Sequence, residues 1–290
     1  MEINGYTRTC GLIGNPVEHT MSPVIHNTLS DSQGQNIRYV PFHVNDGLLG
    51  EAVKGAWALN LLGLNVTVPY KRDVIPFLCE LDPLAERIGA VNTLVRTEKG
   101  FKGYNTDMPG LYRAMCDDKV SVENEHVIVL GAGGVARAVA MLLLEKKAAH
   151  VTILNRTVER ARKVADEVNG FAGHDLVDVL SFAEYGKLSG KKYLVIQATS
   201  VGMSPKVNEA PVEDDGFYDL VHTGYDLIFN PLETKFMRLV KEHGGRAFCG
   251  YKMLLYQGII AYEYWTGLHV DDALSAKVYA KMLESAGKVK

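Results

Sequence analysis

The stretch Val127-Ile-Val-Leu-Gly-Ala-Gly-Gly-Val-Ala-Arg-Ala-Val-Ala140 decides the fold of this 290-residue chain. Its apolar run ends at glycines and continues as an alanine-rich segment, which is typical of a strand, a tight turn and a helix. Gly131-x-Gly133-x-x-Ala136 is the variant dinucleotide-binding fingerprint in which alanine takes the third place. The glycines let the backbone approach a pyrophosphate, whose charge the helix N-terminus favours. A glycine-rich turn with a purely structural role is the alternative.

The next strand predicts which nucleotide binds. His150-Val-Thr-Ile-Leu154 is a short β-branched run, and Asn155-Arg156-Thr157 follows it. The end of this strand, about 20 residues past the glycines, is where an NAD-binding chain usually carries Asp or Glu for the ribose 2′-hydroxyl. Arg156 and Arg160 favour a 2′-phosphate instead, because a guanidinium pairs with it bidentately. We therefore predict that the chain binds NADP. The alternative is that Arg156 and Arg160 form a solvated basic face.

The composition is that of an ordinary globular chain, long enough for two domains. Hydrophobic residues make up 47% and charged residues 22%. A formal net charge of −3 without a long basic block argues against nucleic-acid binding. No apolar run approaches the roughly 20 residues of a membrane span, and the N-terminus lacks the pattern of a signal peptide. We expect neither nucleic acid nor a membrane as a partner.

The cysteines and histidines favour a metal-free chain in a reducing compartment. The four cysteines, Cys10, Cys79, Cys116 and Cys249, are scattered without a C-x-x-C pair. This spacing favours free thiols in the cytoplasm over a disulfide framework or a zinc site. The nine histidines form no H-E-x-x-H motif. We therefore expect a cytoplasmic protein with no metal.

Strands that alternate with helices predict an α/β fold with mainly parallel sheets. We expect further strands at residues 8–14, 38–44, 61–68, 193–198, 224–229 and 246–249, and a hairpin joining 90–96 to 100–104. We expect helices at 23–30, 46–58, 74–80, 83–88, 108–118, 158–168, 234–243, 253–266 and 271–286. Ser22 is predicted to cap the first of these helices, and Asn45 or Asp46 the second.

Polar side chains gather at the predicted turns before the glycines. The hydroxyls of Thr20 and Ser22 lie two residues apart ahead of a helix, which suits a carboxylate ligand, although simple helix capping also explains Ser22. Strand alternation puts Asn65 and Thr67 on one face.

Lys71 follows this strand's carboxyl end, where α/β sites gather, although a lone lysine is usually a solvated charge. Asn92 and Asp107 are placed to face a small polyol, and ordinary turn chemistry is the alternative.

Taken together, these motifs resemble those of the shikimate dehydrogenase family, and the resemblance covers essentially the whole chain. The matching segments are Gly14-Asn-Pro…Ser22-Pro…His26, Asn65-Val-Thr-Val-Pro…Lys71, Gly89-Ala-Val-Asn92-Thr, Gly103-Tyr-Asn-Thr-Asp107, Gly131-Ala-Gly-Gly134, Asn155-Arg-Thr157, Ala198-Thr-Ser-Val-Gly202-Met203, Tyr225-Asp-Leu-Ile-Phe-Asn-Pro231 and Gly250-Tyr-Lys-Met-Leu-Leu-Tyr-Gln257.

The resemblance implies an N-terminal α/β substrate-binding domain at residues 1–107 and a Rossmann-type NADP-binding domain at 108–249. The C-terminal helices, at residues 250–290, return to the first domain. The implied reaction is the reversible NADPH-dependent reduction of 3-dehydroshikimate to shikimate, on the route to chorismate and the aromatic amino acids, by a monomer or homodimer. Lys71 and Asp107 would be catalytic.

The resemblance also implies a set of binding residues. The substrate-binding residues would be Thr20, Ser22, Thr67, Lys71, Asn92, Asp107, Tyr225 and Gln257. The cofactor-binding residues would be Gly131, Ala132, Gly133, Gly134, Val135, Ala136, Asn155, Arg156, Thr157, Arg160, Thr199, Met203 and Gly250.

Thr20 departs from the family pattern, because many members carry serine at this position. Threonine keeps the hydroxyl but adds a methyl group, which leaves open the choice between shikimate and quinate.

Two rival functions remain. An NAD-dependent quinate/shikimate dehydrogenase would be favoured by an acidic residue near position 156, where this chain has arginine. A catalytically silent sensor of NADP or shikimate would be expected to lack the lysine–aspartate pair, but Lys71 and Asp107 are both present. We therefore favour the NADP-dependent enzyme.

Overall fold

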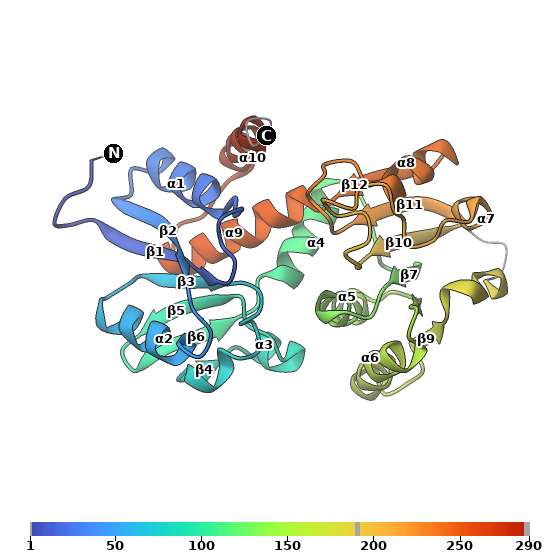
Figure 1. Cartoon of the computed structure of the whole chain (residues 1–290), viewed down its shortest axis with the longest axis horizontal. Coiled ribbons are helices and arrows are strands. Elements are labelled where there is room, and N and C mark those ends of the chain that lie inside the picture. Colours follow the sequence, from blue (N-terminus) through green and yellow to red (C-terminus); the bar gives the residue numbers. More distant parts are fainter. Residues whose placement is uncertain (1, 189–191, 287–290) are drawn as a thin grey trace. The chain divides into compact units, whose positions relative to one another are not determined.

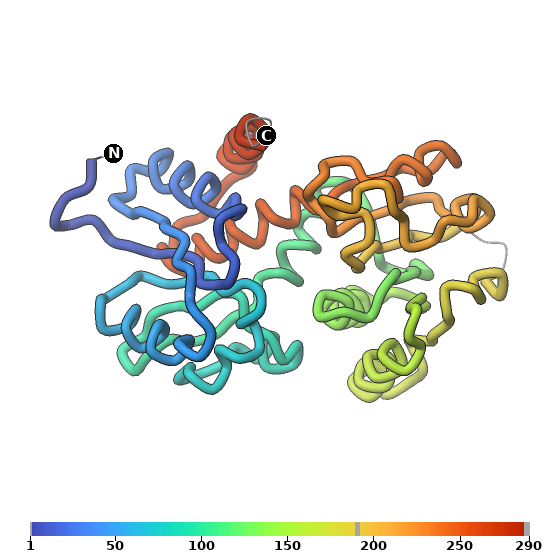
Figure 2. The backbone as a smooth tube through the Cα atoms, viewed as in Figure 1, coloured from blue at the N-terminus to red at the C-terminus, as the bar shows by residue number. Residues whose placement is uncertain are grey.

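The chain divides into two units, which a computed structural model describes over residues 2–188 and 192–286 (Figure 1). The first unit consists of Met1–Gly110 and Leu255–Lys290, and the second of Leu111–Leu254. The chain crosses between the units inside two helices, α4 (Asp107–Asp117) and α9 (Tyr251–Thr266). Figure 2 shows this course, in which the blue N-terminal and red C-terminal segments belong to the same unit.

The first unit is built on a mixed six-stranded sheet in the order β2-β1-β3-β5-β6-β4. The pairs β1–β2, β1–β3 and β4–β6 are parallel, whereas β3–β5 and the hairpin β5–β6 are antiparallel. The strands are β1 (Arg8–Gly14), β2 (Ile37–His43), β3 (Gly63–Val66), β4 (Glu80–Leu81), β5 (Thr93–Thr97) and β6 (Gly100–Tyr104). The other elements of this unit are α1 (Ser22–Ser32), α2 (Leu49–Ala58), η1 (Ile75–Phe77), α3 (Pro83–Ile88) and α10 (Asp272–Ala286).

Apolar side chains bury both faces of this sheet. One core cluster includes Leu64, Leu94 and Phe101, and another joins Cys10 to Trp265 of α9. The Trp265 indole N–H donates a 2.9 Å hydrogen bond to the Leu94 carbonyl oxygen. A Cβ atom on Gly63 would lie 2.1 Å from the Trp265 ring nitrogen, so glycine is required where α9 packs closely on the sheet.

The second unit is built on a parallel six-stranded sheet in the order β12-β11-β10-β7-β8-β9. Its strands are β7 (His126–Leu130), β8 (His150–Leu154), β9 (Val177–Leu180), β10 (Tyr193–Gln197), β11 (Val221–Asp226) and β12 (Arg246–Cys249). Its other elements are α5 (Gly134–Glu145), α6 (Val158–Ala172), η2 (Phe182–Lys187), α7 (Asp215–Tyr218) and α8 (Lys235–Glu242). The strand order reverses between β7 and β10, and such a reversal is where doubly wound sheets bind their ligands.

The predicted α/β class is confirmed, and several predicted elements have the predicted bounds: strands 8–14, 150–154 and 246–249, and helix 83–88. The helix predicted at 74–80 is wrong, because η1 covers only Ile75–Phe77 and β4 then begins at Glu80. The helix predicted to begin at 46 starts at Leu49 and has Leu48 at its N-cap position.

Three further elements, β9, η2 and α7, were not predicted. Within the described residues, no helix is both long enough and apolar enough to cross a membrane.

Candidate active site

Lys71 and Asp107 form an ion pair at one end of the sheet in the first unit. The Lys71 Nζ atom lies 2.6 Å from Asp107 Oδ2, and the two side chains are 30% and 16% exposed. The Lys71 carbonyl oxygen accepts a 2.7 Å hydrogen bond from the Val91 N–H, and the neighbouring Tyr70 hydroxyl donates to the Val44 carbonyl oxygen. These bonds fix the turn that follows β3. The ammonium group is therefore held in place at a partly open surface.

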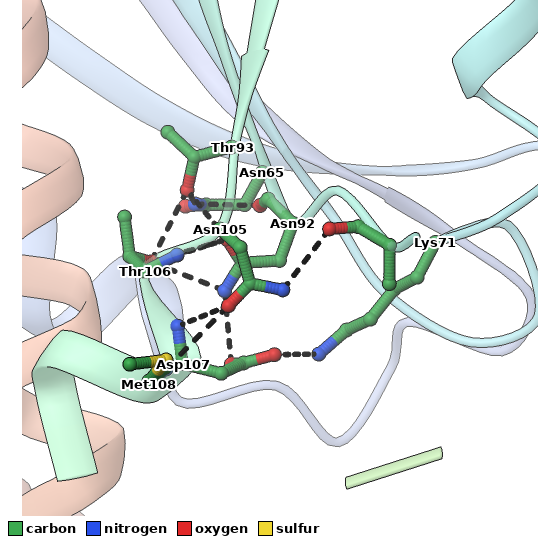
Figure 3. A network of polar contacts seen from close by, with 9 residues as sticks. Asn65, Lys71, Asn92, Thr93, Asn105, Thr106, Asp107 and Met108 are labelled. Carbon is green, nitrogen blue, oxygen red and sulfur yellow. Dashed lines mark hydrogen bonds and ion pairs between the residues drawn. The ribbon is translucent and has the colours of Figure 1, made fainter. Parts of the chain in front are cut away.

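Asn92 supplies the second donor to the Asp107 carboxylate (Figure 3). Its Nδ2 atom lies 2.9 Å from Asp107 Oδ1, while its Oδ1 atom accepts the Thr106 backbone N–H at 2.8 Å. The Asp107 N–H donates to Asn105 Oδ1 at 3.1 Å. Because each carboxylate oxygen has its own donor, Asp107 is fixed in orientation. Asn92 and Asp107 were each expected to face a small polyol, and the structure joins them directly, whereas the sequence motif assigned no role to Thr106 and Asn105.

Asn65 lies within β3, and the predicted strand at residues 61–68 is shorter than expected. Strand β3 ends at Val66, so Thr67 lies in the turn beyond it. Asn65 is buried, and its side chain bonds to the Thr93 hydroxyl and the Asn92 carbonyl oxygen. Asn65 therefore supports the site through its hydrogen bonds to Asn92 and Thr93.

Thr20 and Ser22 lie together at the start of α1. Their hydroxyl oxygens are 3.1 Å apart, and Thr20 Oγ1 also accepts the Ser22 N–H at 3.2 Å. The prediction that Ser22 caps the helix is wrong. Ser22 is the first helical residue, Met21 occupies the N-cap position, and within the described residues no side chain caps this helix. The Ser22 hydroxyl is consequently not used for capping.

Gln257 lies on α9 beside the first turns of α4. A Cβ atom on Gly110 would come within 2.7 Å of the Gln257 backbone nitrogen. Gly110 is three residues after Asp107, so both lie on one side of α4. Within the first unit, glycine thus lets the Gln257 backbone approach the helix that carries the ion pair.

Tyr225 belongs to the second unit, where its side chain is buried at the end of β11. Its hydroxyl donates a 3.0 Å hydrogen bond to Asp118 Oδ2. The Lys252 ammonium lies 2.6 Å from the other oxygen of Asp118 and 2.5 Å from Asp117 Oδ2. The acidic partner of Tyr225 and the lysine that pairs with it had no signal in the sequence, because Asp118 and Lys252 are far from Tyr225 along the chain.

Asp226 follows Tyr225 and is fully buried. Burial raises the pKa of its carboxyl to about 7, even though the Thr234 hydroxyl and the Ile228 N–H both donate to it. These bonds join the end of β11 to the residue before α8. Asp226 therefore anchors both ends of the loop at residues 227–233.

The glycine turn lies at the point where the parallel sheet reverses its order. Gly131 has a φ of +105°, and a Cβ atom there would lie 2.7 Å from the Thr199 side chain, which follows β10. Gly133 precedes α5, and in the part of the chain that the structure describes no side chain caps this helix. Gly133, Gly134 and Val135 are exposed, whereas Ala136 is buried. The helix N-terminus is therefore open to an anion.

The turn after β8 is exposed and basic. Asn155 Nδ2 donates to the Thr157 carbonyl oxygen at 2.8 Å, which shapes the turn that leads into α6. Arg156, Thr157 and Arg160 are all exposed. Both guanidinium groups are thus accessible beside the second strand of the parallel sheet.

Thr199, Met203 and Gly250 complete the predicted cofactor set. The Thr199 hydroxyl accepts the Val201 N–H at 3.0 Å, and the Met203 side chain is exposed. Gly250 packs against the loop that Asp226 anchors, since a Cβ atom there would lie 2.3 Å from the Leu227 carbonyl oxygen. The Gly250 N–H donates to the Ile228 carbonyl oxygen at 3.0 Å.

Comparisons with known proteins match both units. The family models "Shikimate dehydrogenase substrate binding domain" and "Shikimate / quinate 5-dehydrogenase" match residues 12–94 and 114–214. A relative from Carboxydothermus hydrogenoformans, named shikimate dehydrogenase (NADP(+)), is 40% identical over 92% of this chain and 95% of its own. A crystal structure of a shikimate dehydrogenase with NADP+ has a TM-score of 0.89 and 33% identity, covering 98% of this chain and 97% of that one. Another, from Thermus thermophilus with NADP(H) and shikimate, has a TM-score of 0.84 and 29% identity, covering 95% and 100%.

The fold and the site define a dinucleotide-dependent oxidoreductase: the first unit carries a lysine–aspartate pair, and the second unit has a parallel sheet with a glycine turn. The chain belongs to the shikimate dehydrogenase family. The prediction of this family is confirmed, and relatives are NADP-dependent, as predicted. The roles of individual residues stay predictions.

Proposed function

We propose that this protein catalyses the reversible NADPH-dependent reduction of 3-dehydroshikimate to shikimate. The observation that carries the proposal is the ion pair between Lys71 and Asp107, which holds an ammonium group 2.6 Å from a fixed carboxylate at a partly open surface. That unit matches a family model for substrate binding. The family's place in the biosynthesis of chorismate and aromatic amino acids supports a biosynthetic role.

Lys71 is the proposed proton donor. Reducing a ketone adds hydride to carbon, which NADPH supplies when bound, and leaves negative charge on the oxygen. The Lys71 ammonium stabilises this developing alkoxide and gives it a proton. Asp107 orients the ammonium and accepts a hydrogen bond from a ring hydroxyl. In the reverse direction, neutral Lys71 removes the proton from the substrate hydroxyl.

The remaining polar groups are proposed to hold the two ends of the substrate. The adjacent hydroxyls of Thr20 and Ser22 bind the carboxylate, which the N-terminus of α1 also favours. Tyr225 is the third proposed carboxylate ligand, and this role requires its hydroxyl to turn away from Asp118. The proposed ligands of the ring hydroxyls are Thr67, Asn92 and Gln257.

The second unit is proposed to bind NADP. The open N-terminus of α5 suits the pyrophosphate, and the exposed arginines suit the 2′-phosphate. The proposed pyrophosphate-binding residues are Gly131, Ala132, Gly133, Gly134, Val135 and Ala136. The proposed ligands of the adenosine 2′-phosphate are Asn155, Arg156, Thr157 and Arg160. Thr199, Met203 and Gly250 are the remaining proposed contacts.

The test is the initial rate of cofactor reduction with shikimate or quinate, each paired with NADP or NAD. A dominant rate with shikimate and NADP supports the proposal. Comparable rates with quinate or NAD would replace it with a broader quinate/shikimate dehydrogenase. In that case Thr20→Ser becomes the first variant to examine, because the added methyl group beside Ser22 is the departure from the family pattern.

Arg156→Ala is expected to weaken NADP binding by about 10- to 100-fold, because hydrogen bonds between charged groups contribute about 1.5–3 kcal/mol each. NAD lacks the 2′-phosphate, so its affinity should change little. Titration of both cofactors by fluorescence or calorimetry measures the difference. Arg162→Ala is the matched control, since Arg162 is also exposed on α6. Equal losses for NADP and NAD would show that Arg156 does not recognise the phosphate.

We also propose a cytoplasmic location, supported by four cysteines that are all free. A monomer or homodimer remains the proposed assembly, and sedimentation of the purified protein would distinguish the two.

A further inference from the structure

We propose that Tyr39 is a positioning residue for the ion pair between Lys71 and Asp107. It acts through a chain of four hydrogen bonds that all point toward the Asp107 carboxylate. This inference rests on the proposed function, because it assigns Tyr39 a part in the same reaction. Tyr39 lies on β2, and three residues separate it from Asp107 along this chain of hydrogen bonds.

The chain of hydrogen bonds runs through buried side chains that lead from β2 to the ion pair. The Tyr39 hydroxyl donates to Asn65 Oδ1 at 2.8 Å, and Asn65 Nδ2 donates to Thr93 Oγ1 at 3.1 Å. The Thr93 hydroxyl donates to Asn92 Oδ1 at 3.1 Å. Finally, Asn92 Nδ2 donates to Asp107 Oδ1 at 2.9 Å (Figure 3). Each bond passes from a donor on one residue to an acceptor on the next.

Backbone groups fix the direction of this chain of hydrogen bonds. The Thr106 N–H, which can only donate, faces Asn92 Oδ1 at 2.8 Å, so the amide nitrogen of Asn92 must face Asp107. The Asn92 carbonyl oxygen, which can only accept, lies 3.2 Å from Asn65 Nδ2. The amide oxygen of Asn65 must therefore face Tyr39, where it needs a donor. Burial raises the pKa of Tyr39 well above its usual range, so its hydroxyl remains a donor.

Burial strengthens the hydrogen bonds of this chain. Tyr39, Asn65, Asn92 and Thr93 are all buried, and aligned hydrogen bonds polarise one another where the local dielectric is low. Removing the first donor takes a hydrogen bond away from the buried Asn65 amide oxygen, and the orientation of the Asn65 side chain is then less tightly fixed. That loss reaches Asp107 through Thr93 and Asn92. A small displacement of a reacting group is enough to slow catalysis strongly.

Helix α1 holds Tyr39 in place. The His26 ring stacks on the Tyr39 ring at 4.2 Å with an interplanar angle of 12°. Asn27 Nδ2 donates to the Tyr39 carbonyl oxygen at 3.2 Å, and the Tyr39 N–H donates to Asn27 Oδ1 at 2.9 Å. Because β2 is an edge strand, Asn27 takes the place of a neighbouring strand.

His26 is the histidine of the Ser22-Pro-Val-Ile-His26 motif. Its stacking on Tyr39 supports the first donor of this chain of hydrogen bonds. Burial lowers the pKa of His26 to about 3, so the ring is neutral near pH 7. The stacked neutral ring therefore provides a flat packing surface for Tyr39. Since α1 also begins with Ser22, one helix positions a proposed carboxylate ligand and the first donor of the chain.

Tyr39→Phe tests the proposal, because it removes only the hydroxyl and keeps the ring that stacks on His26. We expect kcat with shikimate and NADP to fall about tenfold, while KM for NADP stays within about twofold. Tyr262→Phe is the matched control. Tyr262 is a buried tyrosine of the same unit, and it takes no part in the four hydrogen bonds that lead from Tyr39 to Asp107. This variant should retain the wild-type kcat.

A second variant, Thr93→Val, separates positioning from a general loss of packing. It cuts the same chain of hydrogen bonds at its third residue without changing the shape of the side chain. If Tyr39 acts through this chain, the double variant should lose little more kcat than the poorer single variant. Thermal unfolding of each variant verifies that the compared proteins are folded.

The outcomes are distinct. A Tyr39→Phe variant with kcat within about twofold of the wild type overturns the proposal, and so does a double variant in which the two losses multiply. Either result leaves the proposed function intact, since the wild type still oxidises shikimate. A wild-type protein that does not reduce NADP with shikimate contradicts the proposed function itself, and Tyr39 then has no reaction to support.

Discussion

Lys71→Ala is expected to lower kcat for shikimate oxidation by about a thousandfold, while the apparent affinity for shikimate changes by only several-fold. A positioned proton donor contributes about 10²- to 10⁴-fold to a rate, and a thousandfold corresponds to about 4 kcal/mol of the barrier. The ammonium acts mainly on charge that develops at the substrate oxygen during the reaction, so its loss affects turnover more than binding. Steady-state kinetics in both directions measure the two quantities separately.

Lys102→Ala is the matched control for this variant. Lys102 also forms an ion pair within the first unit, with Glu80, and its side chain is 23% exposed, close to the 30% of Lys71. Both variants thus remove a lysine and break an ion pair, but only Lys71 faces the site. We expect the control to retain kcat within about twofold. Near-normal turnover of Lys71→Ala would remove this lysine from the chemistry.

Local sequence signals predicted the elements whose ends are set by neighbouring residues. The helix at residues 83–88 has Pro83 in its first turn, Asp82 as a side-chain cap and Gly89 with a φ of 66° at its end. The glycine turn was likewise recognisable, because Gly131 needs a positive φ and approaches Thr199 closely. In both places a residue type is required by the backbone itself.

The prediction failed where distant residues decide the structure. The segment at residues 74–80 does not continue as a helix, because the Cys79 N–H bonds to the Phe101 carbonyl oxygen and Glu80 pairs with Lys102 on β6.

The capping role predicted for Ser22 failed for a local reason. Met21 takes the N-cap position, and Thr20 accepts the Ser22 N–H. Neither the strand pairing of Glu80 nor the N-cap position of Met21 is visible in the pattern of apolar and polar residues.

The site shows the same division. The residue types at positions 71, 92 and 107 were noted from local motifs, but only the resemblance to a family joined Lys71 to Asp107, which is 36 residues away. The contacts of Tyr39 with Asn65 and of Tyr225 with Asp118 span 26 and 107 residues. Burial of these polar groups depends on the assembled sheet, so sequence periodicity does not reveal that they need partners.

Asp107→Asn is the second large expected effect, although the two side chains have nearly the same shape. Asp107 Oδ1 accepts from Asn92 and Oδ2 accepts from Lys71. An asparagine must place its amide nitrogen at one of these positions, so either orientation brings two donors together. We expect kcat to fall by about 10²- to 10³-fold, because Lys71 loses the carboxylate that orients it.

The same variant should also be less stable. The free energy of unfolding is expected to fall by about 1–3 kcal/mol, since a mostly buried donor is left without its acceptor. Asp107 begins α4, and loss of its negative charge at the helix N-terminus adds about 0.3–1 kcal/mol. Denaturant unfolding measures this change independently of activity.

Asp82→Asn provides the matched control for Asp107→Asn. Asp82 Oδ1 accepts the Leu84 N–H at the start of α3, and asparagine caps a helix about as well as aspartate. The control should therefore keep both kcat and stability. If Asp107→Asn also kept its turnover, the negative charge beside Lys71 would be dispensable, and Lys71 would have to be oriented by its own turn, through the bond between its carbonyl oxygen and Val91.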